Sequence, residues 1–107
     1  MTIKRSFTKS ALKEIRSIHA LSKRYNKTLN KNHTKALMHL VKEHADEIEE
    51  LSEKKDKHFV TETGDLAILC FEIIMENKAS IDAVIGKCYK RYMKKLTQLI
   101  SEEEGKT

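Results

Sequence analysis

The 107-residue chain has no proline, no tryptophan and only three glycines. Proline breaks helices and glycine weakens them, so this scarcity leaves long stretches in which little interrupts a helix. Hydrophobic residues make up 39% of the chain and charged residues 35%, a balance that suits a helical protein and is too apolar for a disordered one. The composition therefore favours an all-α fold, and the length suits a single domain over residues 1–107.

Cysteine is also scarce, and long hydrophobic runs are absent. Cys70 and Cys88 have neither the spacing of metal ligands nor the density of a disulfide framework, so we expect buried free thiols in a reducing compartment. The longest nearly unbroken apolar run, residues 66–75, is about half the ~20 residues that a membrane-spanning helix needs. The N-terminus lacks the long apolar segment of a signal peptide. We therefore expect a cytoplasmic protein without a membrane partner.

The net charge of +5 is unevenly distributed along the chain. Residues 1–35 contain ten lysines and arginines and one acid, whereas residues 43–65 contain nine acids and three lysines. Residues 87–95 contain five lysines and arginines and no acid. A uniformly basic chain would indicate nucleic-acid binding, but an acidic centre between basic flanks instead allows a cation site with anion-binding surroundings.

Apolar residues recur at helical spacing in four segments. We predict helices over about residues 8–23, 32–51, 61–77 and 80–101. The polar stretch 26–32 is expected to be a loop, and residues 1–7 and 102–107 are expected to be flexible.

Capping residues and apolar faces support these helices. Asn32 or Thr34 can cap the second helix, Thr61 the third and Ser80 the fourth. The third helix is apolar nearly all round and only Glu72 interrupts it, so we expect it to be buried on most sides. The second helix carries an apolar seam, spaced 4-3-4-3, of Leu37, Val41, His44, Ile48 and Leu51. The fourth carries a longer apolar face of Ile81, Val84, Ile85, Cys88, Tyr92, Leu96, Leu99 and Ile100.

Two groups of acids stand out. Glu43, Asp46, Glu47 and Glu50 are spaced i, i+3, i+4 and i+7, which places them on one arc of the second helix. Taken alone, this arc has the pattern of an ordinary solvated face. Glu62 and Asp65 lie in the predicted first turn of the third helix, where carboxylates favour the helix dipole, at the mouth of the core.

Antiparallel packing of the second and third helices would bring these two groups of acids together. Converging carboxylates repel one another strongly unless a cation lies between them. Ligation by oxygen alone selects Mg²⁺ or Mn²⁺ rather than zinc. The sequence therefore indicates a site for a hard divalent cation, although a lysine partner for Glu62 and Asp65 is an alternative.

The acidic motifs resemble those of the MazG-like all-α nucleotide pyrophosphohydrolases. Members of that family carry E-E-x-x-E on one helix and E-x-x-D, often written E-x-G-D, on the next. Residues 40–47 look like the first motif, and Glu62-Thr63-Gly64-Asp65 looks like the second, including its glycine. The resemblance covers about residues 37–96.

The chain departs from the family pattern at several positions. Lys42 replaces the first glutamate of the first motif, and Asp46 replaces the last, unless the ligand is the neighbouring Glu47. The last helix of the family usually carries a lysine, an asparagine and an arginine. Lys87, Arg91 and Lys94 have that spacing here, with Arg91 in place of the asparagine.

The resemblance implies a four-helix bundle completed by oligomerisation, as a homodimer or homotetramer. It also implies Mg²⁺-dependent hydrolysis of nucleoside or deoxynucleoside triphosphates to the monophosphate and pyrophosphate, with Mn²⁺ as a substitute. The metal ligands implied by the resemblance are Glu43, Asp46, Glu62 and Asp65. Glu47 is expected to be the general base or a fifth ligand. The implied phosphate-binding residues are Lys87, Arg91 and Lys94.

Two other functions compete with this one. The same amphipathic pattern suits a helical dimerisation or regulatory protein without a metal, or a divergent inactive member of the family. The basic first helix could contact nucleic acid through Lys9, Lys13, Arg16, Lys23 and Arg24. The acidic centre would repel a nucleic-acid backbone, so we do not expect that partner.

Overall fold

The computed structural model describes residues 7–106, and all regular structure in this range is helical. The elements in chain order are α1 (Phe7–Thr28), α2 (His33–Glu53), α3 (His58–Glu76) and α4 (Ile81–Glu104). This confirms the prediction of an all-α chain with four helices. The flexibility expected for residues 1–6 and 107 lies outside the described residues.

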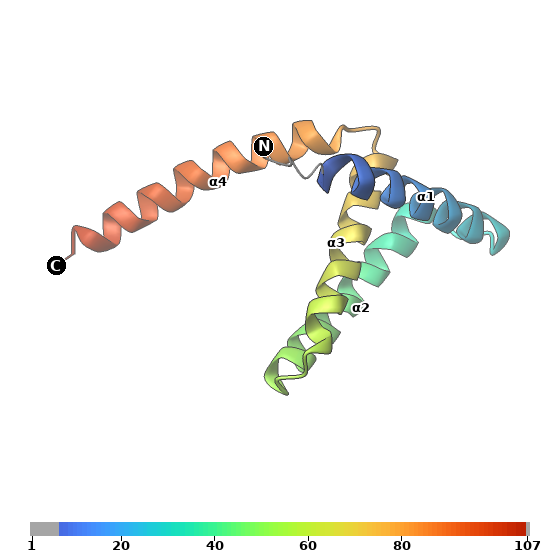
Figure 1. The fold of residues 1–107 in the computed structure, drawn as a ribbon, viewed down its shortest axis with the longest axis horizontal. Coiled ribbons are helices and arrows are strands. Elements are labelled where there is room, and N and C mark those ends of the chain that lie inside the picture. Colours follow the sequence, from blue (N-terminus) through green and yellow to red (C-terminus); the bar gives the residue numbers. More distant parts are fainter. Residues whose placement is uncertain (1–6, 107) are drawn as a thin grey trace, which may run out of the picture.

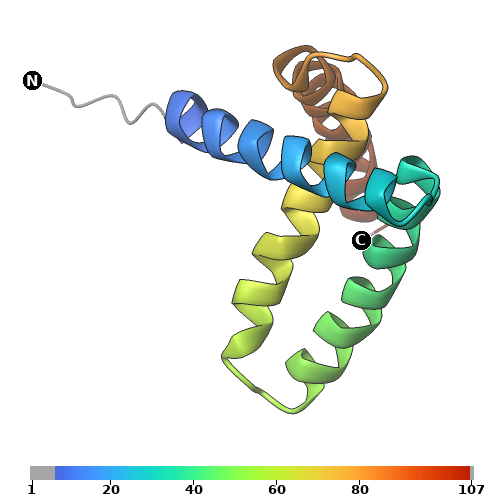
Figure 2. The ribbon, with the colours of Figure 1, turned by 90° about the vertical axis from the view of Figure 1, so that its right-hand side faces the viewer.

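The helices form an open assembly (Figure 1). α2 and α3 pair as an antiparallel hairpin, and α1 crosses the end of that hairpin where α2 begins and α3 ends (Figure 2). Beyond its first turns, α4 extends away from the other helices (Figure 1). The radius of gyration is 17.5 Å, whereas a compact domain of this length has about 13 Å. The single chain is therefore not a closed four-helix bundle, and completion by oligomerisation stays a prediction.

The core is small and lies where α1, α2 and α3 meet. Each of these helices contributes one buried hydrophobic residue, Ile15, Leu37 and Leu69. The predicted seam of α2 is confirmed, because Leu37 is buried and the other four seam residues are half-buried. The seam therefore holds the hairpin together.

The expectation that the third helix is buried on most sides is confirmed in part. Within residues 66–75, Leu69 and Glu72 are buried, Ala67 and Cys70 are exposed, and the others are half-buried. Cys88 on α4 is half-buried. Both thiols are free, as expected, but the burial predicted for Cys70 is not found.

Two predicted helix starts are confirmed and one is wrong. The Asn32 side chain accepts a hydrogen bond from the backbone N–H of Lys35, and Ser80 caps α4 in the same way. Thr61 does not cap α3, which begins earlier, at His58. The cause is Asp56, whose carboxylate accepts a hydrogen bond from the backbone N–H of His58 at 2.9 Å. Glu62 and Asp65 therefore lie beyond the first turn, away from the unpaired N–H groups that favour acids there.

The first helix extends to Thr28, further than the predicted end near residue 23. Asn26 was expected in a loop but lies inside α1, 7% exposed. Its side chain is 2.9 Å from Nδ1 of His33, so a buried hydrogen bond replaces the solvation that a polar residue normally seeks. α4 likewise continues to Glu104, past the predicted end at residue 101.

None of the helices within residues 7–106 is both long enough and apolar enough to cross a membrane.

Candidate metal sites along α3

Four acids of α3 lie on one side of the helix. Glu62, Asp65, Glu72 and Glu76 are separated by three, seven and four residues, which at about 100° per residue keeps them within one arc. Leu69 falls in the same arc and is buried. This arc therefore faces α1 and α2, and α3 presents a row of carboxylates to both.

The first cluster lies between α2 and α3. Single ligand atoms of His44, Glu62 and Asp65 all lie within 4.8 Å of one another. Nε2 of His44 is 3.7 Å from Oε2 of Glu62, and Nε2 of His58 is 3.2 Å from Oε1 of Glu62. The Glu62 carboxylate, 14% exposed, thus lies between two imidazoles, whereas Asp65 is exposed. The structure brings together two of the four predicted metal ligands.

A small hollow adjoins this cluster. It has a volume of about 190 Å³ and is lined by Ile18, His44, Asp65, Ile68, Leu69 and Glu72. Asp65 and Glu72, two of the four acids of α3, therefore border one partly apolar recess. A charge in this recess is less screened than one at the open surface.

The predicted ligands of α2 are not in this cluster. Oε1 of Glu43 is 2.8 Å from Nε2 of His39 on the same helix, and both side chains are more than half exposed. Asp46 and Glu47 are exposed as well. At about 100° per residue, the direction of the α2 seam differs from that of Glu43 and Asp46 by more than 90°. The seam faces α3, so His44 reaches Glu62 and the acids point elsewhere.

The acidic arc of α2 behaves as a solvated face at its far end. Nζ of Lys54 is 2.8 Å from Oε1 of Glu50, one turn away. This hydrogen bond, with the attraction between the opposite charges, lowers the pKa of Glu50 and raises the pKa of Lys54.

The three predicted phosphate-binding residues lie on the extended part of α4. Lys87, Arg91 and Lys94 are exposed, and α4 leads away from the α2–α3 hairpin there (Figure 1). The Arg91 guanidinium lies 5.3 Å from the centre of the Tyr92 ring. The single chain does not bring these cations to Glu62 and Asp65, and their role stays a prediction.

A second cluster lies where α1 crosses the hairpin. Glu72 is 1% exposed. Its Oε1 is 3.2 Å from Nδ1 of His19, and it accepts a hydrogen bond from the Ser22 hydroxyl. Both partners lie on α1, so the buried carboxylate of α3 is held by the crossing helix. Buried carboxylates require such donors.

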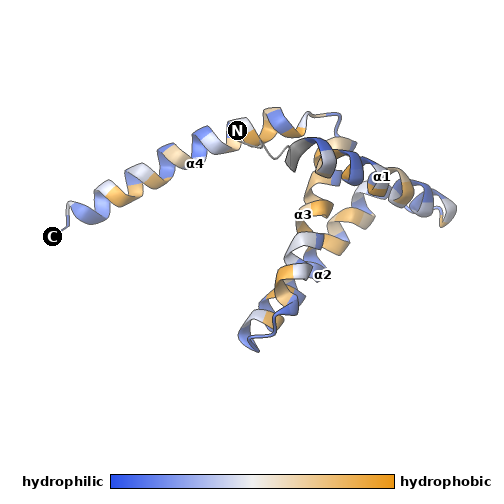
Figure 3. Ribbon diagram, viewed as in Figure 1, coloured by the Kyte–Doolittle hydropathy of each residue, from blue (hydrophilic) through white to orange (hydrophobic). Residues whose placement is uncertain are grey.

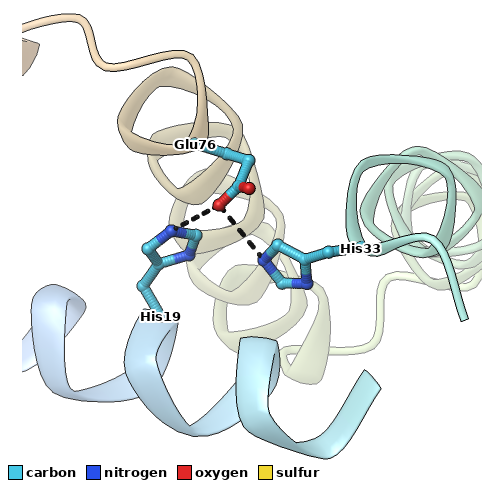
Figure 4. Close-up of side chains that lie close together, drawn as sticks. All are labelled: His19, His33 and Glu76. Atoms are coloured by element: carbon cyan, nitrogen blue, oxygen red, sulfur yellow. Dashed lines mark ion pairs between the residues drawn. The ribbon is translucent and has the colours of Figure 1, made fainter. Parts of the chain in front are cut away.

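Next to it, Glu76 lies between two histidines (Figure 4). Oε2 of Glu76 is 3.1 Å from Nε2 of His19 and 3.9 Å from Nε2 of His33. Oε1 of Glu76 is 3.3 Å from Nζ of Lys23. The histidine rings are tilted by 45°, with their centres 5.2 Å apart. Three helices thus contribute to a compact group of nitrogen and oxygen atoms.

The sequence-based prediction missed this second group and gave His44 only a packing role. A signal for it was present, because Glu72 interrupts the apolar side of α3 and His19 and Ser22 occupy apolar-spaced positions of α1. Polar residues at such positions on two helices predict a polar contact between them. The sequence could not indicate that His33, at the start of α2, joins them.

Comparison with known proteins adds no relative. No protein-family model matches the chain, and neither characterised proteins nor solved structures gave a match.

Proposed function

We propose that the protein hydrolyses nucleoside or deoxynucleoside triphosphates to the monophosphate and pyrophosphate, with Mg²⁺ or Mn²⁺ held at Glu62 and Asp65. The observation that supports this proposal most is the closeness of these two acids across from α2, within 4.8 Å of each other and of His44. They are also the acids of the E-x-G-D motif, which carries the resemblance to the MazG-like enzymes.

The donor set suits a hard divalent cation. Glu62 and Asp65 supply carboxylate oxygens from adjacent turns of α3, and oxygen is the ligand that Mg²⁺ and Mn²⁺ prefer. When bound, the cation would neutralise phosphate oxygens and activate water. The triphosphate is a polyanion, so the two acids alone would repel it. In the single chain, Glu43 and Asp46 lie on the flank of α2, away from this pair. Their role as metal ligands therefore stays a prediction.

His44 is placed to handle a proton at this site. Its Nδ1 is 2.9 Å from the backbone carbonyl of Leu40. A carbonyl can only accept, so Nδ1 carries a proton, and in the neutral ring Nε2 carries the lone pair. In that form this nitrogen can accept the proton of an attacking water, one of the two roles that the resemblance implies for Glu47. His44 is therefore a second candidate for the general base.

The direct test is pyrophosphate release from a panel of nucleoside and deoxynucleoside triphosphates, with and without Mg²⁺ or Mn²⁺. We expect metal-dependent hydrolysis that falls at least about 100-fold in Glu62→Gln and in Asp65→Asn, because losing a ligand costs at least as much as losing its supporting contacts. Glu50→Gln is the matched control, an exposed acid of α2 that should leave the rate unchanged. No hydrolysis by the wild-type protein, or equal rates in all variants, would refute the proposal.

A second function, that of a helical dimerisation protein without catalysis, is favoured by α4. Large apolar residues on this helix are exposed, namely Ile85, Tyr89, Tyr92, Met93, Leu96, Leu99 and Ile100. Hydrophobic residues recur along α4 well beyond its contact with α3 (Figure 3). An uncovered apolar stripe of this length usually marks a protein contact. A stable dimer that releases no pyrophosphate would identify this second function.

A further inference from the structure

We propose that His19, His33 and Glu76 form a second metal site, which binds a zinc-class transition-metal ion and is separate from the Glu62–Asp65 pair. His19 lies in the middle of α1, His33 is the first residue of α2 and Glu76 is the last residue of α3. The three side chains converge from three helices on one point (Figure 4). A metal there would join α1 to both helices of the hairpin formed by α2 and α3.

The distances suit tetrahedral coordination. Zinc binds histidine nitrogen and carboxylate oxygen at about 2.0–2.2 Å, which places ligand atoms about 3.3–3.5 Å apart in a tetrahedron. Oε2 of Glu76 is 3.1 Å from Nε2 of His19 and 3.9 Å from Nε2 of His33. One ligand atom from each of the three residues lies within 4.8 Å of the others. The contact between Glu76 and His19 is already near ligand spacing, and the wider separations must close when a metal binds.

Two of the three ligand atoms have no hydrogen-bond partner. Nε2 of His33 and Oε2 of Glu76 are buried and form no hydrogen bond; Nε2 of His19 lies 3.1 Å from Oε2 and is a charge partner for it only when the imidazole is protonated. The His33 side chain is 9% exposed, and its Nε2 points to Glu76 across 3.9 Å, which is too far for a hydrogen bond. Buried polar atoms nearly always have a partner, so an orphaned donor or acceptor here requires an explanation. A cation between the two atoms would satisfy both.

The opposite ring nitrogens are held as metal-binding histidines require. Nδ1 of His19 is 3.2 Å from Oε1 of Glu72. With Nδ1 donating to that carboxylate, the neutral ring of His19 presents its Nε2 lone pair to the site. Nδ1 of His33 is 2.9 Å from the nitrogen of the Asn26 side-chain amide. Rotating that amide by 180° exchanges its nitrogen and oxygen, and the oxygen can then accept a hydrogen bond from Nδ1. A carboxylate or amide behind each histidine is the usual support of a metal ligand.

The local charge also favours a cation. Glu72 and Glu76 supply two carboxylates, and Lys23 neutralises one of them through Oε1 of Glu76 at 3.3 Å. Oε2 of Glu76 stays available for a metal. A proton on His19 could bridge Glu72 and Glu76 instead, but that arrangement would leave Nε2 of His33 unpartnered. The mixed nitrogen and oxygen donors select zinc-class ions over Mg²⁺.

The test is zinc titration of metal-free protein at neutral pH, followed by calorimetry and thermal unfolding. We expect one ion per chain at this site and a melting temperature higher by about 10 °C or more when free zinc is about 100 times the Kd. Glu76→Gln and His33→Gln should each weaken binding at least about tenfold. His39→Gln and Glu50→Gln, which change exposed side chains of α2, are controls that should bind like the wild type.

Two results of the zinc titration would overturn this proposal. One is wild-type protein that does not bind zinc, and the other is binding that survives Glu76→Gln and His33→Gln but is lost in Glu62→Gln. Far-UV circular dichroism establishes that each variant is folded. Because a substitution could unfold α1, a second readout uses only the wild type. Co²⁺ should give the strong visible absorption of a tetrahedral site, and only the weak absorption of six-coordinate Co²⁺ would also overturn the proposal.

Discussion

At the residue scale, polar side chains decide how α1 meets the hairpin. Glu72 is almost fully buried, and its known partners, His19 and Ser22, both lie on α1. A hydrophobic residue at position 72 would pack against α1 at many angles, whereas a carboxylate requires donors at defined positions. These hydrogen bonds therefore fix where α1 crosses α3.

Ser22→Ala tests this role. The change removes one donor from a buried carboxylate, and hydrogen bonds to charged groups contribute about 1.5–3 kcal/mol. We expect the free energy of unfolding, measured by urea denaturation, to fall by about that amount. Ser17→Ala is the matched control, because the exposed Ser17 hydroxyl bonds only to the Lys13 carbonyl of its own helix. It should change stability by less than about 0.5 kcal/mol. Equal effects of the two substitutions would contradict this role of Glu72.

The site was only partly predictable at this scale. Glu62 and Asp65 are three residues apart on one helix, so their proximity follows from local geometry alone. The position of Glu43 and Asp46 depends on which side of α2 faces α3. The apolar seam decides that orientation, and it turns His44 towards Glu62 instead. The sequence of α2 contains both the acidic arc and the apolar seam. The seam determines which side faces α3, because burying its apolar surface stabilises the packing.

At the scale of elements, the ends of α1, α2 and α3 share one backbone feature. Each of the first three helices is followed by a four-residue connection whose second residue has positive φ, Asn30 (57°), Lys55 (56°) and Lys78 (56°). After α3, the backbone N–H of Lys78 donates to the Met75 carbonyl and that of Ala79 to the Ile74 carbonyl. These are the two hydrogen bonds of the Schellman motif. The motif usually has glycine at this position, and its absence here explains why helix ends were harder to predict than starts.

Lys78→Gly should therefore stabilise the protein. The left-handed conformation costs a residue with a Cβ about 1 kcal/mol, and glycine adopts it without that cost. We expect a gain of up to about 1 kcal/mol in the free energy of unfolding, measured by urea denaturation. Ala79→Gly is the control, since Ala79 is not among the positive-φ residues and should gain nothing from glycine. A loss of stability in Lys78→Gly would show that the motif does not form.

At the scale of the whole molecule, the shape differs most from what the sequence predicts. Helix number and approximate positions follow from local periodicity, which the sequence contains in full. How the helices assemble depends on contacts between distant residues. α1, α2 and α3 meet around a small core, and α4 has no such contacts beyond its first turns (Figure 1). The predicted bundle, completed by oligomerisation, would need something to cover α4.

A second copy of the chain is the occupant that we expect on α4. Light scattering coupled to size-exclusion chromatography should give the mass of a dimer or tetramer. Leu96→Glu places a charge in the apolar stripe and should shift the protein towards monomer, because burying an unpaired charge is costly. Lys95→Glu, its neighbour outside the stripe, is the control and should keep the wild-type mass. A monomeric wild-type protein at tens of micromolar would contradict this expectation.

The central claim is that Glu62 and Asp65 hold a hard divalent cation, and paramagnetic Mn²⁺ tests it most directly. In the amide NMR spectrum, small additions of Mn²⁺ should first broaden the signals of residues around Glu62, Asp65 and the facing His44, and Asp65→Asn should abolish that selectivity. Broadening spread evenly over all acidic surfaces, or centred elsewhere in the chain, would contradict the claim.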